Sequence, residues 1–457
     1  MRANAISSAV ARLDDGRFLA DLSRRVAIRS ESQDPPRPDD LAAYLGEEMI
    51  PAFEELGFAC EIFDNPVAGR GPILLAERHE DERRPTLLSY GHGDVVPGYD
   101  EAWTRGAGPW RLTVDGERVY GRGTADNKGQ HSVLIDAVAA VLETRGKLGF
   151  NTKVLIETAE EAGSAGLREF CRANRDRLAA DLFIASDGPR VRLEPTIFLG
   201  SRGLVNFRLS VKLREGNHHS GNWGGALANP AIILANAVST IVDARGRVLV
   251  PALLPKELPE SVRRALRDCP VGGEPGDPEI DPDWGEPGLT PSERVFGWNT
   301  FEVLAITAGN PAQPANAVPP EAVATCQIRF VVGSDHENFL PAIRTHLDAH
   351  GFPQVAVEPV KDRVMLPTRL DPEHPRVTWA AASIEMTLGR RPVILPNLGG
   401  GLPNDIFASD LGLPTLWVPH SYPGCRQHGP DEHNTLPIFR EGLAMMAGLL
   451  WDLGEED

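Results

Sequence analysis

The chain has 457 residues, of which 42% are hydrophobic and 24% are charged, so it can form a large buried core and is not a disordered chain. Its formal net charge of −18 excludes a general role in binding nucleic acid or anionic lipid. No apolar run approaches the roughly 20 residues that span a membrane, and charges interrupt the start too early for a signal peptide. The five cysteines are scattered and form no CxxC pair, which argues against a disulfide framework or a thiolate zinc site. We therefore expect a cytoplasmic protein with neither nucleic-acid nor membrane partners.

The first part of the chain alternates between helical and strand-like segments. Helices are predicted at 13–27 and 38–57, where apolar residues recur every three or four positions. Four strand-length apolar runs follow, at 73–76, 86–90, 153–157 and 181–185. A predicted helix at 132–143 lies between the second and the third of them. This rhythm predicts a doubly wound sheet, in which ligands collect beyond the carboxyl ends of the strands.

The pattern changes near residue 197. The next segments indicate antiparallel strands at 196–198, 205–213 and 318–332, a helix at 229–243 and a long Pro/Gly/acid-rich surface loop at 270–289. The α/β rhythm then returns with a helix at 375–388, a strand at 414–419 and a closing helix at 437–453. We therefore predict an α/β fold, in which a doubly wound mixed sheet built from 1–197 and 366–457 is interrupted by a smaller α+β domain at 198–365.

Imidazole and carboxylate side chains follow the predicted strands in five clusters. They are His92 and Asp94 in GHGD, Asp126 in GRGTADNKG, Glu160 and Glu161 in TAEEAG, Asp187 in ASDG, and His428 in QHGPDEHN. Such side chains crowded at one sheet edge would leave unpaired charges unless a cation neutralised them. Two histidines with several carboxylates suit Zn²⁺, with Mn²⁺ or Co²⁺ as alternatives, and a shared carboxylate would allow a two-metal hydrolytic site.

These motifs, in this order and at these separations, resemble the M20 family of metallopeptidases, which includes carnosinase-type dipeptidases, acetylornithine deacetylase and succinyl-diaminopimelate desuccinylase. The resemblance implies that Asp126 bridges two metal ions. His92 and Asp187 would complete one site, and Glu161 and His428 would complete the other. The domain of 1–197 and 366–457 would then be catalytic, and the insert at 198–365 would serve as lid and dimerisation domain.

The same resemblance assigns three catalytic roles. Glu160 takes the place of the general base, and Asp94 that of the carboxylate that orients His92. His219, in NHHSGNWGG, takes the position of a histidine that reaches into the neighbouring subunit of dimeric members and stabilises the oxyanion. A homodimer is therefore expected.

Four residues are candidates for binding substrate. Arg329 in CQIRFV stands where the carnosinase-like enzymes hold the substrate carboxylate, and a guanidinium suits this task. Asn316 in PANAVPP falls where the family often lines the substrate site. Gly400 and Gly401 lie in GGGLP, where the dipeptidases commonly read GGSIP, so only backbone amides remain there for a carboxylate.

Three departures put dipeptide specificity in question without removing a metal ligand. Gly401 lacks the serine hydroxyl, Gly93 stands where an aromatic residue is usual, and Asn127 stands where an acid is common. We predict a dinuclear zinc hydrolase that cleaves the amide bond of short peptides, foremost dipeptides. An N-acyl amino acid deacylase with the same mechanism and a non-catalytic small-molecule binder on the same fold remain the alternatives.

Overall fold

The computed structural model describes residues 1–274 and 277–456, which form two compact units. The larger unit comprises Met1–Leu199, Leu370–Leu395 and Pro403–Asp457, and the smaller unit comprises Gly200–Arg369 and Pro396–Leu402. The expected boundaries differ from this division at 198–199, 366–369 and 396–402. The last of these segments places Gly400 and Gly401 in the smaller unit.

The larger unit is built on an 8-stranded mixed sheet with the strand order β1-β2-β6-β3-β7-β16-β8-β15. Its strands are β1 (Ala59–Phe63), β2 (Ile73–Arg78), β3 (Thr86–His92), β6 (Asn151–Glu157), β7 (Leu182–Ala185), β8 (Thr196–Phe198), β15 (Val393–Leu395) and β16 (Thr415–Trp417). β3 runs parallel to β6 and to β7, so the carboxyl ends of these three strands meet at one edge. A small sheet of β4 (Thr113–Asp115), β5 (Arg118–Tyr120) and β17 (His433–Thr435) accompanies it.

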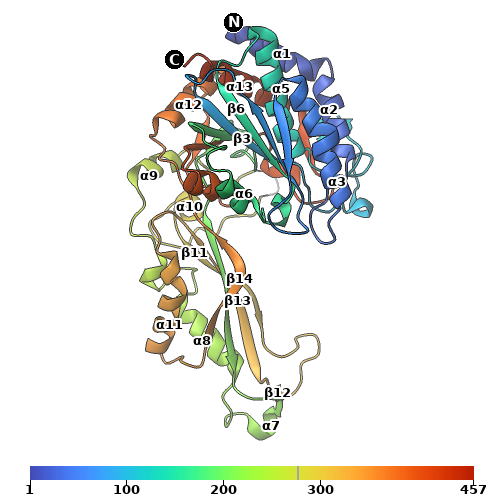
Figure 1. The fold of residues 1–457 in the computed structure, drawn as a ribbon. Helices are drawn as coiled ribbons and strands as arrows, with labels where there is room; N and C mark the ends of the chain where they lie inside the picture. The colour runs from blue at the N-terminus through green and yellow to red at the C-terminus, as the bar shows by residue number, and fades with distance from the viewer. Residues whose placement is uncertain (275–276, 457) are drawn as a thin grey trace. The chain divides into compact units, whose positions relative to one another are not determined.

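Helices cover this sheet and bring the two ends of the chain together. They are α1 (Arg2–Asp14), α2 (Arg17–Ala27), α3 (Pro38–Ala43), the π-helical turn η1 (Tyr44–Met49), α4 (Ile50–Glu55), α5 (Lys128–Arg145), α6 (Leu167–Ala173), α12 (Pro375–Leu388) and α13 (Leu436–Leu453). α5 packs on β3, and α1 and α13 pack on α5, so these three helices lie side by side (Figure 1). Arg2 of α1 forms an ion pair of 2.8 Å with Asp452 of α13.

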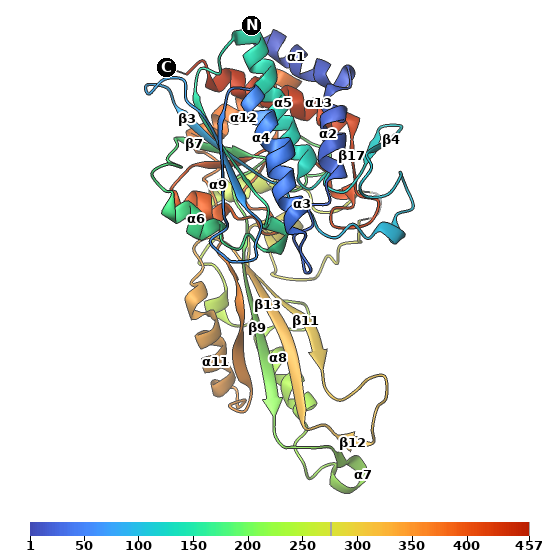
Figure 2. The same ribbon diagram turned by 45° about the vertical axis from the view of Figure 1, so that its right-hand side comes forward.

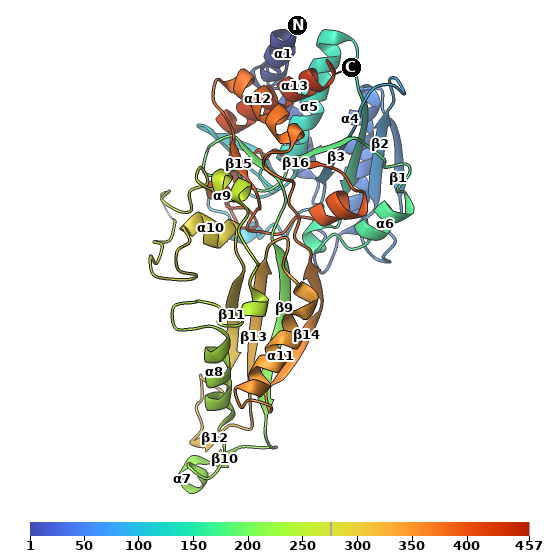
Figure 3. The ribbon, with the colours of Figure 1, turned by 90° about the vertical axis from the view of Figure 1, so that its left-hand side faces the viewer.

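The smaller unit has a four-stranded antiparallel sheet with the order β11-β13-β9-β14. Its elements are β9 (Gly203–Lys212), β10 (His218–His219), α7 (Ser220–Trp223), α8 (Pro230–Ile241), α9 (Glu260–Leu266), α10 (Pro291–Phe296), β11 (Thr300–Thr307), β12 (Ala317–Val318), β13 (Glu321–Phe330), α11 (Phe339–Ala349) and β14 (Ala356–Met365). α8 and α11 pack on the sheet (Figures 2 and 3). Alternate residues of β9 and β13 point into the core between sheet and helices, which explains their alternating pattern in the sequence.

The predicted α/β class with a mixed sheet and a separate smaller antiparallel sheet is confirmed. Two local predictions need refinement. Residues 196–198 form a strand, but this strand, β8, belongs to the larger sheet, where it pairs in parallel with β15 and antiparallel with β16, because a three-residue run carries no alternation that could fix its direction. The helix expected at 38–57 runs without a gap from Pro38 to Glu55, with the π-helical turn η1 between α3 and α4.

In the predicted loop at 270–289, residues 275–276 lie outside the described residues, and the remainder contains neither helix nor strand. Within the described part of the chain, none of the helices combines the length and apolar character that a membrane crossing requires.

Candidate metal centre

The carboxyl ends of three neighbouring strands carry four of the predicted site residues. His92 is the last residue of β3, Glu160 and Glu161 open a short 3-10 turn after β6, and Asp187 follows β7 by two residues. Each strand is almost fully buried and contains a short apolar run, and the chain becomes polar where it leaves the sheet. The parallel pairing therefore brings these side chains to one place.

Asp126 lies at the centre of the cluster. It precedes α5, is 3% exposed, and contacts a histidine through each carboxylate oxygen. Its Oδ1 lies 2.9 Å from His92 Nε2, and its Oδ2 lies 2.9 Å from His428 Nε2. His428 belongs to the loop between β16 and β17, 302 residues further along the chain.

The potential ligand atoms fall into two sets that share Asp126. One set is His92, Asp126 and Asp187, and the other is Asp126, Glu161 and His428; within each set the ligand atoms all lie within 4.8 Å of one another. A third set of the same size joins His92 to Glu160 and Glu161. Among the described residues, these are the sets of histidine, cysteine and carboxylate side chains close enough to hold an ion.

The carboxylates of this cluster outnumber its two histidines, and despite burial the contacts with Asp126 raise the pKa of both His92 and His428. Burial and the Asp126 charge raise the pKa of Asp187 to about 6. Burial, followed by repulsion from Asp126, also raises the pKa of Glu161 well above its usual range, and burial raises that of Glu160. Asp126 itself behaves oppositely, because contacts with His428 and His92 outweigh its burial and lower its pKa.

The residues present fit a divalent metal site. Four buried or nearly buried carboxylates lie close to only two imidazoles, and Glu161 Oε1 is buried without a hydrogen-bond partner. Nitrogen and carboxylate donors of this kind suit zinc, manganese or cobalt. A bound cation would reverse the repulsion that raises the carboxyl pKa values.

Asp94 supports the cluster from behind His92. His92 Nδ1 lies 3.0 Å from the Asp94 carbonyl oxygen and 3.4 Å from its Oδ1. The Asp94 carboxylate also accepts the backbone N–H groups of Glu160 (3.2 Å) and Glu161 (3.0 Å), which fixes the turn that carries them. The Ser32 hydroxyl donates to Asp94 Oδ2 at 2.5 Å.

Two residues of the site were not found in the sequence. Ser32 contacts Asp94 from the segment after α2, and Gln427 Nε2 donates to Asp126 Oδ2. Neither lies next to a strand end, so only the position of Gln427 beside His428 could have drawn attention to it.

The smaller unit contains the other predicted residues, beginning with His219 and Asn316. His219 is exposed in β10, where it pairs with Ala317 of β12, and its Nδ1 accepts the N–H of Gly221 at 3.1 Å. The Asn316 carbonyl accepts the N–H of Ser220 at 2.8 Å, so His219 and Asn316 are neighbours across this short ribbon.

Arg329 occupies β13, half-buried, with its Nη1 buried and unpartnered. Its Nε donates to Gln327 Oε1 at 3.1 Å. Burial and the nearby Arg329 charge lower the pKa of Arg202 to about 9. The two guanidinium groups repel each other, and an anion bound between them would relieve this repulsion. In the GGGLP segment, a Cβ at Gly401 would lie 2.5 Å from Met365 Cε, whereas a Cβ at Gly400 would meet only Leu398 Cδ2, at an ordinary contact distance of 3.9 Å.

The structure explains two departures from the family pattern. A Cβ at Gly93 would lie 2.4 Å from the ring of Tyr44, which is fully buried and hydrogen-bonded to His131 (2.5 Å). Tyr44 therefore fills the space that an aromatic residue at 93 would need. Asn127 donates through Nδ2 to the carbonyl of Ser186 at 2.7 Å, a bond that an ionised acid could not make.

Replacing Gly93 with alanine is expected to lower the free energy of unfolding by about 2 kcal/mol, because the added methyl overpacks a rigid buried ring. Urea unfolding of the metal-free protein measures this change without a contribution from metal binding. Gly46→Ala is the matched control, because nothing lies within 4 Å of its Cβ, and this variant should be as stable as the parent or more so. Equal stability of Gly93→Ala and the parent would contradict the packing argument.

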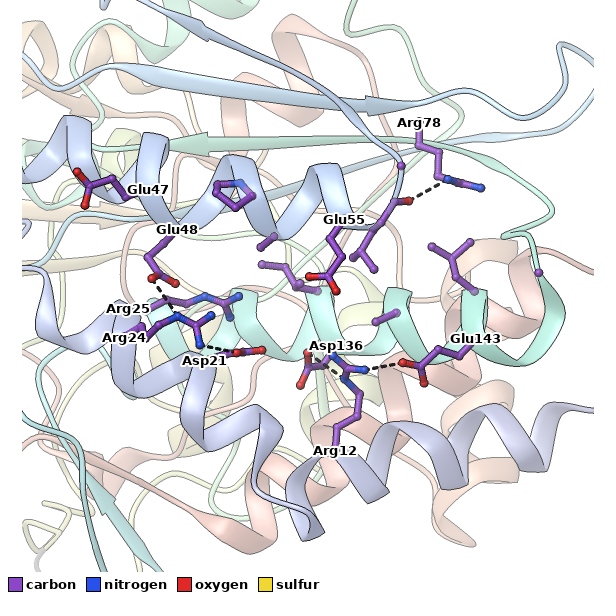
Figure 4. A pocket seen from close by; sticks show the side chains of 18 residues that line it. Arg12, Asp21, Arg24, Arg25, Glu47, Glu48, Glu55, Arg78, Asp136 and Glu143 are labelled. Carbon is purple, nitrogen blue, oxygen red and sulfur yellow. Dashed lines mark hydrogen bonds and ion pairs between the residues drawn. The ribbon is translucent and has the colours of Figure 1, made fainter.

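A separate cavity of 650 Å³ lies among α1, α2, α4 and α5 (Figure 4). Its charged side chains are largely paired with one another. Arg12 contacts Asp136 and Glu143, and Arg24 contacts Asp21 and Glu48, at 2.7–3.2 Å. The cavity shares no residue with the metal-ligand sets.

The chain is similar in sequence to several dipeptidases. The chain is 33% identical over 261 residues to the Beta-Ala-His dipeptidase of Mus musculus, which covers 54% of this chain and 52% of the relative. It therefore spans about half the length of the first curated relatives that it matches. It is 27% identical to the cysteinylglycine-S-conjugate dipeptidase of Corynebacterium striatum, over 77% of this chain and 76% of that one.

The fold also matches a solved structure. It superimposes on an M20 family metallo-carboxypeptidase, Sso-CP2 of Sulfolobus solfataricus, with a TM-score of 0.77 and 25% identity, over 96% of this chain and 99% of that one. The family model for peptidase family M20/M25/M40 matches residues 88–452, a range that includes every predicted metal ligand. The chain belongs to this family of metallopeptidases.

Proposed function

We propose that this protein is a dinuclear zinc hydrolase that cleaves the amide bond of short peptides, foremost dipeptides. The observation that carries the proposal is the pair of ligand sets that share Asp126. His92 and Asp187 would hold one ion together with Asp126, and Glu161 and His428 would hold the other. Mn²⁺ or Co²⁺ suits the same donors. When bound, the two ions supply Lewis acidity and lower the pKa of water.

Glu160 is the general base in this proposal. Its backbone N–H is fixed by Asp94 at 3.2 Å, so its carboxylate is held beside the ligand cluster. Glu160 accepts a proton from the attacking water and then returns it to the leaving amine nitrogen. Asp94 holds the Nδ1 side of His92 and thereby leaves Nε2 directed at the cluster.

Arg329 is proposed to bind the substrate carboxylate. Its unpartnered Nη1 and the neighbouring Arg202 charge support an anion-binding role. The backbone amides of Gly400 and Gly401 are proposed to line the same substrate site. Asn316 lies beside His219, at the opposite end of β13 from Arg329, and is proposed to line the substrate site of the other subunit in a homodimer. A free carboxylate at one end of the substrate is common to dipeptides and N-acyl amino acids.

A deacylase acting on N-acyl amino acids is the second candidate, and Gly401 favours it. This position lacks the hydroxyl that the dipeptidases commonly carry, and Met365 occupies the space that a side chain would fill. A non-catalytic binder is disfavoured by Glu160, since a binder has no use for a base beside its metal ligands.

A substrate panel tests the proposed function. The zinc- or manganese-loaded protein would be given dipeptides, tripeptides and N-acyl amino acids, with a chelator-treated sample as control. Metal-dependent cleavage of dipeptides supports the proposal, and cleavage of acyl amino acids alone transfers the chain to the deacylases. If the two-metal protein cleaves nothing in the panel, the dipeptidase proposal is wrong.

We also propose a cytoplasmic location, which is supported by five free cysteines. A further proposal is a homodimer in which His219 of one subunit stabilises the oxyanion in the active site of the other.

His219→Ala is expected to lower kcat by about 100-fold or more while the protein keeps its metal. Mixed dimers of His219→Ala with Glu160→Gln should regain activity, because one of the two sites then receives both intact residues. Folded mixed dimers that stay inactive would contradict the contribution from the second subunit.

A further inference from the structure

Glu432 is a buried carboxylate that holds the loop carrying Asp126. Its Oε1 accepts three backbone N–H groups, from Gly123 at 3.0 Å, Ala125 at 2.9 Å and Asp126 at 3.1 Å. Its Oε2 accepts a hydrogen bond of 2.6 Å from Arg122 Nη1. The Glu432 side chain is 0% exposed. Among the described residues, these four groups are the donors that its carboxylate accepts from.

The loop depends on this carboxylate because its residues take part in no regular backbone hydrogen-bond pattern of a helix or sheet. Residues 121–127 connect β5 to α5, are buried, and belong to neither a strand nor a helix. Buried backbone N–H groups need acceptors, and Glu432 supplies one oxygen for three of them. The same residue also accepts the Gly121 N–H through its backbone carbonyl at 3.1 Å.

Arg122 extends the connection to the segment behind His92. Its Nη2 donates to the carbonyl of Pro97 at 2.9 Å, and its guanidinium lies 6.0 Å from the Tyr99 ring and 5.9 Å from the Trp103 ring. The Arg122–Glu432 pair is 2.6 Å long with both side chains about 1% exposed. The pair therefore joins the segment that follows β3 to the loop of Asp126.

Glu432 also belongs to the turn that carries His428. Three non-glycine residues in this turn have positive φ angles, Arg426 (57°), His428 (62°) and Asp431 (61°). Such conformations persist only where surrounding contacts impose them. Glu432 follows His428 by four residues. The hydrogen bonds that Glu432 accepts from the Asp126 loop therefore hold one end of this turn in place.

We propose that Glu432, with Arg122, is a positioning residue that sets the Asp126 carboxylate and the His428 imidazole at their 2.9 Å separation. The inference rests on the proposed metal-binding role of these two residues. Neither Glu432 nor Arg122 belongs to a ligand set, so their effect on metal would act through the two loops.

The test compares Glu432→Gln with Glu80→Gln by titration of Zn²⁺ into chelator-treated protein. Glutamine keeps one acceptor oxygen but turns an N–H₂ group toward Arg122 or the loop amides, so we expect the Zn²⁺ affinity to fall about 10- to 100-fold. Glu80 is a matched control, because its carboxylate also accepts two backbone N–H groups (Leu148 and Gly149, both 2.7 Å) and an arginine, Arg78. Glu80→Gln should lower the Tm but keep the parental Zn²⁺ affinity.

A second variant covers the case in which Glu432→Gln does not fold. Glu432→Asp keeps the charge beside Arg122 but withdraws the oxygens by one methylene, so a loss of Zn²⁺ affinity would show that position matters and not charge alone. Parental affinity in folded Glu432→Gln, or in folded Glu432→Asp, overturns the inference. If the parent protein itself binds no Zn²⁺, the proposed function fails instead, and the two failures are thereby distinguished.

Discussion

Glu160→Gln is expected to lower kcat by about 10²- to 10⁴-fold while the protein keeps its full metal content. The amide has nearly the shape of the carboxylate but cannot accept the proton of the attacking water. The backbone N–H of Glu160 and its bond to Asp94 are unaffected by the change, so the turn after β6 should hold its conformation. Steady-state kinetics together with metal analysis of the same sample measure both quantities.

Glu161→Gln is the matched control for this experiment, because the change is identical and the residue is adjacent. Glu161 lies 3.3 Å from His428 and belongs to the set completed by Asp126. This variant should lose metal from one site, whereas Glu160→Gln should not. Loss of metal in Glu160→Gln would instead assign Glu160 to the set formed with His92 and Glu161, and retained turnover would remove it as the base.

The sequence was sufficient for the parts of the site that depend on strand ends. His92, Glu160 and Asp187 each follow a buried apolar run, and parallel pairing of β3, β6 and β7 brings such positions together. The mixed sheet and the separate antiparallel sheet were predictable for the same reason, since buried runs and alternating runs are distinguishable in one dimension.

Contacts between distant segments left no signal in the sequence. Tyr44 fills the space beside Gly93 from a turn that reads as ordinary helix, and Ser32 reaches Asp94 from a segment without periodicity. α1 was also missed before residue 13, because its buried face begins with Ala5 and Ala9, whose small side chains give a weak apolar pattern. In each case the partner decides the role, and the partner lies far away in the chain.

Asp126→Ala is expected to empty both metal sites and to reduce hydrolysis below detection. Asp126 is shared by the two ligand sets, so its removal leaves His92 with Asp187 in one set and Glu161 with His428 in the other. Two ligands are one fewer than the three protein ligands typical of a catalytic zinc site. Metal analysis after dialysis against a weak chelator should give two ions per subunit for the parent and none for the variant.

Asp187→Ala separates a bridging role for Asp126 from a general loss of negative charge. Asp187 belongs to only one of the two sets that share Asp126, so its removal should leave one ion bound. Both changes delete one buried carboxylate whose charge faces His92. A difference between the two variants in the number of bound ions therefore shows whether Asp126 is shared by both metal sites. If Asp126→Ala still binds two ions, or loses only one as Asp187→Ala does, Asp126 does not bridge. The ordered series of two, one and no ions would establish that a single carboxylate, held between two histidines from opposite ends of the chain, organises both sites.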